Sequence, residues 1–272
     1  MGLRLLPVAP RQGWAWIRQA LRLWWRRPLA FVGLFTFFLM TVLLLMVLVP
    51  VVGGALGMAL LPMLSLGFMS ASRSALQGGP VHALQLVEGL RHPQAAQRRA
   101  QWTLCGLYAL CTMLVITLAD AVDAGMFEEL QRLMAQTSNA KTAARIEAIV
   151  AAPELLQGML LRLSLAGLLA VPFWHASALV HWGGQGVVQA LFTSSLALWR
   201  TRGAFSVYML GWAGLMLAVA LAVALIALST GARQVLGVLT MPIGLIFSAA
   251  FYVSLWFSFI DTFGEPASTI KP

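Results

Sequence analysis

The sequence predicts an all-α integral membrane protein with about six transmembrane helices, an N-terminal amphipathic interfacial helix and a two-helix extramembrane cap. The composition is 60% hydrophobic and only 10% charged, whereas soluble domains carry about 25% charged residues. Between Arg27 and Arg73 lie 45 consecutive residues without a charge, and a spanning helix needs about 20 mostly apolar residues. The apolar runs are long and do not alternate in polarity, which disfavours a transmembrane β-barrel.

Residues 1–28 form a basic segment that we expect to lie on the membrane surface. Residues 12–27 read QGWAWIRQALRLWWRR, with a helical apolar arc opposite regularly spaced arginines. Tryptophan prefers the headgroup zone and arginine attracts anionic lipid. The candidate interface residues are Trp14, Arg18, Arg22, Trp24, Trp25 and Arg26. The expected partners are the lipid bilayer and anionic lipid; the alternative is that this helix merely continues the first span.

Residues 29–119 are predicted to hold the first three spans, at 29–49, 51–70 and 101–119. Pro50 and the following glycines mark the reversal between the first two spans. Gly53 and Gly57 are separated by three residues, a spacing of small residues that lets another backbone approach closely. A polar, basic loop over 71–100 precedes the third span.

Residues 120–162 form the acidic hydrophilic stretch, predicted to be an extramembrane helical hairpin with its turn at 137–139. Apolar residues recur at helical spacing on both sides of that turn, which favours a cap of two helices. The remaining spans are predicted at 163–182, 203–230 and 235–260, within a second transmembrane segment covering 163–260. Pro172 interrupts the fourth span, and residues 261–272 form a short tail.

The distribution of basic residues predicts the orientation. With the N-terminus inside, 13 of the 18 Lys and Arg residues fall on the cytoplasmic side. Cytoplasmic loops of membrane proteins carry such an excess, so we expect both termini to be cytoplasmic. The same asymmetry accounts for the net charge of +9 without nucleic acid as a partner.

Polar side chains inside the predicted spans are few. His175, His181 and Tyr252 are the intramembrane candidates. An ionisable residue in the membrane suggests a functional site, but His181 beside Trp182 also suits an interfacial anchor. Tyr252 belongs to a set with Ser248, Ser254 and Ser258 that suits either hydrogen bonding between helices or a polar groove.

No motif for nucleotide binding, zinc proteolysis or serine hydrolysis occurs in the sequence. His175 and His181 would point about 120° apart on a helix, so they are poorly placed to share a metal. Cys105 and Cys111 are predicted to pack as small hydrophobes. We therefore expect no catalytic residue, no cofactor and no metal site.

The opening RLLPVAPRQGWAWIRQALRLWWRRPLAF and the segment ALVHWGGQGVVQALFTSSLALWRTRGAFSVYMLGWAG carry a family resemblance. The chain resembles uncharacterised multi-pass inner-membrane proteins of Gram-negative (beta-)proteobacteria, which contain a domain of unknown function. The resemblance implies the bacterial inner membrane and transfers no catalytic residue. The acidic stretch 120–162 departs from it.

Three hypotheses of function follow. The first is a non-enzymatic scaffold or envelope-accessory protein with a membrane-protein partner. The second is a transporter or lipid-handling protein for a neutral or lipidic substrate. It draws on a faint internal repeat in which a Pro, a Gly-Gly pair and an Ala-Leu pair precede both residue 101 and residue 203. The third is an intramembrane enzyme that uses His175 or His181.

Overall fold

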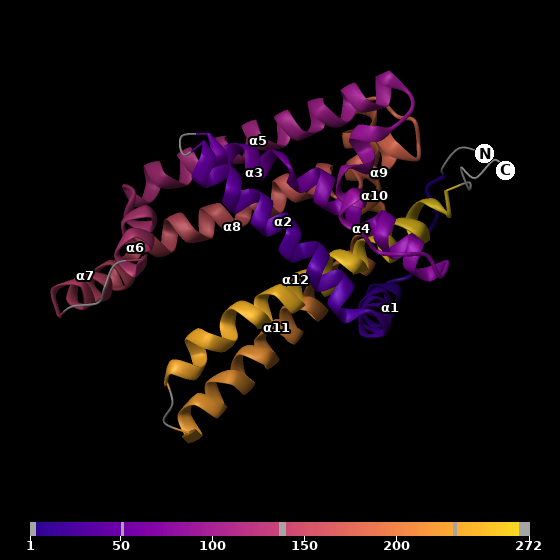
Figure 1. The fold of residues 1–272 in the computed structure, drawn as a ribbon. Coiled ribbons are helices and arrows are strands. Elements are labelled where there is room, and N and C mark those ends of the chain that lie inside the picture. The colour runs from indigo at the N-terminus through magenta and orange to yellow at the C-terminus, as the bar shows by residue number, and fades with distance from the viewer. Residues whose placement is uncertain (1–3, 50–51, 136–139, 231–232, 267–272) are drawn as a thin grey trace.

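The computed structural model describes residues 4–49, 52–135, 140–230 and 233–266, and it contains only helices and connecting segments over those residues (Figure 1). The helices are α1 (Gln12–Arg26), α2 (Pro28–Leu48), α3 (Gly53–Ala59), α4 (Leu61–Leu76), the 3₁₀ helix η1 (Ala83–Arg91), α5 (Ala95–Asp123), α6 (Met126–Ala135), α7 (Ala140–Ala151), α8 (Pro153–Phe173), α9 (Ala176–His181), α10 (Val187–Arg200), α11 (Arg202–Thr230) and α12 (Arg233–Phe263). The all-α prediction is confirmed.

Five stretches of the described chain are long and apolar enough to cross a membrane: α2, α5, α8 continued by α9, α11 and α12. The pair α3 and α4 adds a sixth as a broken span, bent by 41° between the two helices. Pro62 lies in the first turn of α4, where its missing N–H costs no helical hydrogen bond. With five spans, or six when the bent pair is counted as one, the structure agrees with the expectation of about six.

Four of the spans form two helical hairpins that share a base. α5 lies along α8, and α11 lies along α12. Figure 1 shows these hairpins leaving the base in different directions, with α6 and α7 at the far end of the α5–α8 hairpin. The base consists of α1, α4, η1, α9, α10 and the adjoining end of α12 (Figure 1).

Close packing of α3 against α2 depends on the two predicted small residues. A Cβ atom on Gly53 would lie 2.4 Å from the backbone oxygen of Leu45, and one on Gly57 would lie 2.7 Å from the side chain of Val42. Real side chains do not fit at those separations. The predicted close backbone approach is therefore confirmed at Gly53, whereas Gly57 makes room for the side chain of Val42.

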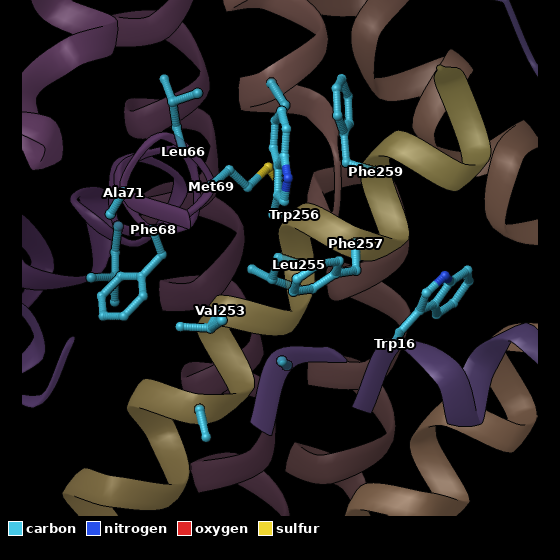
Figure 2. Packing of buried hydrophobic residues seen from close by; sticks show 14 of the residues in the cluster. Trp16, Leu66, Phe68, Met69, Ala71, Val253, Leu255, Trp256, Phe257 and Phe259 are labelled. Atoms are coloured by element: carbon cyan, nitrogen blue, oxygen red, sulfur yellow. The ribbon is translucent and has the colours of Figure 1, made fainter. Parts of the chain in front are cut away.

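Aromatic side chains fill the base of the molecule. Trp256 and Phe259 of α12 stack with their ring centres 6.3 Å apart, and Trp182 lies 5.4 Å from each of them. Figure 2 shows Met69 of α4 pointing toward Trp256, with Trp16 of α1 on the other side of α12. Large aromatic side chains bury extensive surface and have few rotamers, so this core joins α1, α4, α9 and α12 into one body.

The acidic stretch is largely helical. α5 continues to Asp123 and α8 already begins at Pro153, so the spanning helices extend beyond the predicted apolar limits. α6 and α7 lie between them and contact each other, and the turn predicted at 137–139 lies outside the described residues. Arg145 of α7 pairs with Glu129 of α6 at 2.9 Å and holds the pKa of that carboxyl below its ordinary value.

A buried ion pair ties α5 to α8 below this cap. Arg162 bonds to Asp120 and, at 2.5 Å, to Asp123. The Asp123 side chain is fully buried and the Arg162 guanidinium also stacks over the ring of Phe127. A buried charge is tolerated only when it is paired, so this cluster fixes the register of the two helices.

Candidate membrane-interface and intramembrane polar sites

α1 has one face that is buried in the protein. Trp16, Ile17, Ala20, Leu23 and Trp24 are each less than a tenth exposed, and they pack mainly against α11 and α12. Gly13 makes the close approach possible, because a Cβ there would lie 2.0 Å from the backbone oxygen of Ala204. Among the interface candidates, the structure therefore places Trp24 in the protein core.

The other face of α1 is exposed and mixes aromatic with basic side chains. Trp25 is 77% exposed and Trp14 is 48% exposed, and the candidate arginines of this helix, Arg18, Arg22 and Arg26, are exposed beside them. A shallow hollow of about 470 Å³ lies on this face and is lined by Leu21, Arg22, Trp25 and Arg26. The structure thus brings three of the six interface candidates together in one concave surface.

Hydrogen bonds hold α1 in place from both ends. Gln12 Nε2 and Trp16 Nε1 both donate to Asp261 Oδ2 of α12, at 2.5 and 2.8 Å. At the other end, Arg27 donates to the backbone oxygens of Gly78 and Gly79. Hydrogen bonds to a carboxylate are stronger than neutral ones, so contacts within the protein are sufficient to hold α1 in its docked position.

His175 lies between α8 and α9 and is fully buried. Its ring lies 5.5 to 6.0 Å from the rings of Phe205, Phe259 and Phe263. Neither ring nitrogen has a hydrogen-bond partner among the described residues. This aromatic enclosure favours a neutral imidazole, because burial of an unpaired charge is costly.

The break before α9 is held open by a side chain from α10. The backbone N–H of His175 donates to Ser194 Oγ at 3.1 Å, and that hydroxyl donates to the carbonyl of Val171, also at 3.1 Å. In an unbroken helix this N–H would bond directly to the carbonyl four residues earlier. The serine hydroxyl is therefore inserted into the helical ladder, a recognised cause of a sharp kink.

His181 meets η1 rather than the exterior. Its Nε2 lies 3.6 Å from Glu88 Oε1, and its side chain is 9% exposed. Its ring lies 5.0 Å from the ring of His92 and 5.6 Å from that of Trp182. The contact brings together a carboxylate and two imidazoles from segments that are far apart in the sequence.

The contacts around His181 lower the pKa of both of its titratable neighbours, Glu88 and His92. Burial raises the pKa of Glu88, but its polar and charged neighbours, His181 foremost among them, outweigh that effect and hold the pKa below its ordinary value. Burial, together with the charge of His181, lowers the pKa of His92. The backbone N–H of Gln94 donates to Nδ1 of His92 at 3.2 Å, which requires that nitrogen to be unprotonated.

Tyr252 packs among aromatic rings at the junction of α2, α4 and α12. Its ring centre lies 5.4 Å from Phe68, 5.8 Å from Phe35 and 5.9 Å from Phe251. The neighbouring polar residue on α12, Ser254, hydrogen bonds to Tyr208 of α11 at 2.6 Å. Of the two alternatives predicted for these polar residues, Ser254 therefore shows hydrogen bonding between helices and not a polar groove.

Several polar contacts were not evident from the sequence. The Glu88–His92–His181 group, the Ser194 bridge and the Asp261 anchor each join segments that no local pattern connects. A second apolar stripe on α1, formed by Trp16, Ala20 and Leu23 at spacings of four and three, is the one signal that could have indicated the docked face.

These features define the class of protein: an all-α integral membrane protein whose spans share an aromatic base with a docked amphipathic helix. A probable inner membrane protein of Burkholderia thailandensis is 32% identical to this chain over 281 residues, covering 99% of this chain and 98% of the relative. The chain belongs to the family of that protein and is a multi-pass inner-membrane protein. No family model and no solved structure matches it.

Proposed function

We propose that the protein is a non-enzymatic scaffold of the inner membrane that holds a membrane-protein partner along its diverging hairpins. The observation that carries this proposal is the contrast between the two ends of the molecule. The base is locked by aromatic packing, whereas α11 exposes apolar side chains at positions from Met209 to Leu228, including Leu210 and Leu217. A rigid base with long apolar arms suits a platform for other helices.

Site-specific photocrosslinking in living cells tests the proposal. A photoreactive amino acid at Leu210, Leu217 or Leu221, all exposed on α11, should yield a discrete crosslinked species with one protein. The same partner should co-purify with the solubilised protein without crosslinking. A probe at the buried Trp212 is the matched control on the same helix and should give no such species.

Two results would overturn the scaffold. One is crosslinking of every exposed α11 position to lipid alone. The other is consistent recovery of the protein by itself after mild crosslinking of intact membranes. Either result would count against the scaffold, because substitutions at these exposed positions of α11 leave the packed base of the molecule intact.

A lipid-handling activity is the second candidate, and the divergence of the two hairpins favours it (Figure 1). Leu163 and Leu168 of α8, like Leu210 of α11, are exposed and apolar, so acyl chains can contact both arms. Purified protein in vesicles should then accelerate movement or transfer of a fluorescent phospholipid. An unchanged rate relative to protein-free vesicles would leave the scaffold as the remaining proposal.

The orientation belongs to the same proposal: both termini and the aromatic base face the cytoplasm, and α6 and α7 face outward. The excess of arginine around α1, η1 and α10 supports this arrangement, because basic segments resist translocation. The outward cap instead carries acidic residues, including Glu128, Glu129 and Glu147.

A further inference from the structure

We propose that the exposed face of α1 binds the phosphate group of an anionic phospholipid, with Arg22 and Arg26 as its ligands and Trp25 and Leu21 against its apolar portion. This inference does not depend on the scaffold function. It narrows the anionic lipid expected from the sequence to one docked phospholipid and assigns four residues to its binding.

The hollow is shallow and open, and its lining on α1 has the chemistry that a phospholipid headgroup requires. Its volume is about 470 Å³, and it is lined by two guanidinium-bearing and two apolar side chains. Arg22 and Arg26 are four residues apart on α1, a spacing that places them next to each other on a helix. Guanidinium groups match phosphate oxygens in a forked, two-bond geometry.

These arginines are available for a ligand. Over the part of the chain that the structure describes, Arg18, Arg22 and Arg26 form no ion pair and donate no hydrogen bond, whereas Arg132, Arg145 and Arg162 are all paired with carboxylates. Unpaired exposed cations on a membrane-facing helix attract anionic lipid headgroups. The face is therefore basic without internal compensation.

The depth of the hollow in the membrane follows from the next helix. α2 begins at Pro28, two residues after Arg26, and crosses the membrane. Leu29, at the start of that span, is 85% exposed and must lie near the end of the hydrocarbon region. Arg22, Trp25 and Arg26 consequently lie at the level of the headgroups, where tryptophan and arginine are favoured.

The docked position of α1 adds to the affinity expected for this site. The bonds from Gln12 and Trp16 to Asp261 and the buried face of the helix fix its rotation. Free amphipathic peptides must fold as they bind, but this helix is already ordered, and preorganisation reduces the cost of binding. The same rotation keeps Trp25 outward, at 77% exposure.

Trp25 and Leu21 identify a lipid rather than a soluble phosphate as the ligand. A free phosphate ion would use only the guanidinium groups and leave the apolar walls of the hollow in water. A phospholipid satisfies both, because its glycerol and upper acyl region can cover the indole while its phosphate meets the arginines.

Native mass spectrometry of the purified full-length protein tests this site, with phosphatidylglycerol and phosphatidylcholine as the probes. The wild-type protein should retain phosphatidylglycerol in preference. The double variant R22Q/R26Q should lose this preference by about tenfold or more, because each removed surface cation weakens attraction to anionic lipid. W25A should weaken retention of both lipids, since the indole contacts the uncharged part.

The matched control is R91Q/R99Q, which removes the same charge from two exposed arginines of η1 and α5. It should retain the wild-type preference. Thermal unfolding of all variants should be unchanged, because Arg22, Trp25 and Arg26 are exposed.

Three outcomes would overturn the proposal: unchanged lipid preference in R22Q/R26Q, an equal loss in R91Q/R99Q, or displacement of phosphatidylglycerol by millimolar inorganic phosphate. The second outcome would show a general charge effect. The third would show a phosphate-ion site. The double variant R22K/R26K supplies an independent measure. It keeps both positive charges but loses the forked guanidinium geometry, so it should bind phosphatidylglycerol with intermediate affinity.

Discussion

At Gly158 the absence of a side chain lets α8 lie directly against a buried carboxylate. A Cβ atom there would lie 2.7 Å from Cβ of Asp123 and 2.8 Å from its Oδ2. That carboxylate is the one that holds Arg162. A single methyl group would therefore push apart the ion pair that joins α5 to α8.

We expect G158A to lower the free energy of unfolding by about 1–3 kcal/mol, because overpacking a filled contact costs that much. At an open position in a helix, replacing glycine by alanine usually raises the free energy of unfolding, because alanine is the better helix former by about 1 kcal/mol. We expect the opposite change at Gly158. Unfolding in mixed detergent micelles measures the difference. G167A on the same helix, where nothing lies within 4 Å of a Cβ, should be neutral or stabilising; equal effects at the two positions would contradict the explanation.

The tryptophans of α1 show what the sequence can predict about single residues and what it cannot. Helical spacing predicted that Trp14, Trp24 and Trp25 share an apolar arc. The arc exists, but the protein covers one edge of it, so Trp24 is buried while Trp14 and Trp25 remain exposed. A periodic pattern identifies apolar positions and cannot distinguish lipid from a neighbouring helix, because both are apolar surroundings.

Among the elements, the junction of α8 and α9 depends on a third helix. Pro172 was expected to interrupt this span, and α8 indeed ends at Phe173. The bridge through Ser194 was not predictable, because it comes from a segment 19 residues beyond His175. Proline indicates where a helix is weak, but the partner that stabilises the kink is set by tertiary packing.

Removing the hydroxyl in S194A should destabilise the protein by about 1–3 kcal/mol, because it leaves a buried N–H and a buried carbonyl without their shared partner. S195A is the matched control, since the Ser195 hydroxyl only bonds to the carbonyl of Leu191 in its own helix. Unfolding in mixed micelles should separate the two variants. If S194A were as stable as S195A, the hydroxyl would not be what holds the break open.

At the scale of the whole molecule, the membrane-spanning segments could be predicted from the sequence, but the way in which they pack against one another could not. Long uncharged runs identify membrane helices because hydrocarbon excludes charge. The way α5 pairs with α8 and α11 with α12 depends on close packing and a few polar contacts, since lipid supplies no hydrophobic force between helices. The Glu88–His181 contact shows the same limit, because its residues lie on η1 and α9.

The proposed orientation makes a prediction at this scale. A reporter that is active only outside the cytoplasm should be active when fused at residue 140 and inactive at residues 90 and 270, because the arginine excess keeps the latter two inside. A reporter with the opposite requirement, fused at the same positions, provides the control. The reverse pattern would overturn the orientation without affecting the fold.

The anchor at Asp261 also sets an order on biosynthesis. Its donors, Gln12 and Trp16, are 249 and 245 residues earlier in the chain. Ribosomes therefore release α1 long before the carboxylate that receives it exists. Until the last span is inserted, the first helix has no docking surface on α12, and Trp16 has no acceptor there. The carboxylate that holds α1 lies on α12, so the native base can form only after that helix has been synthesised and inserted.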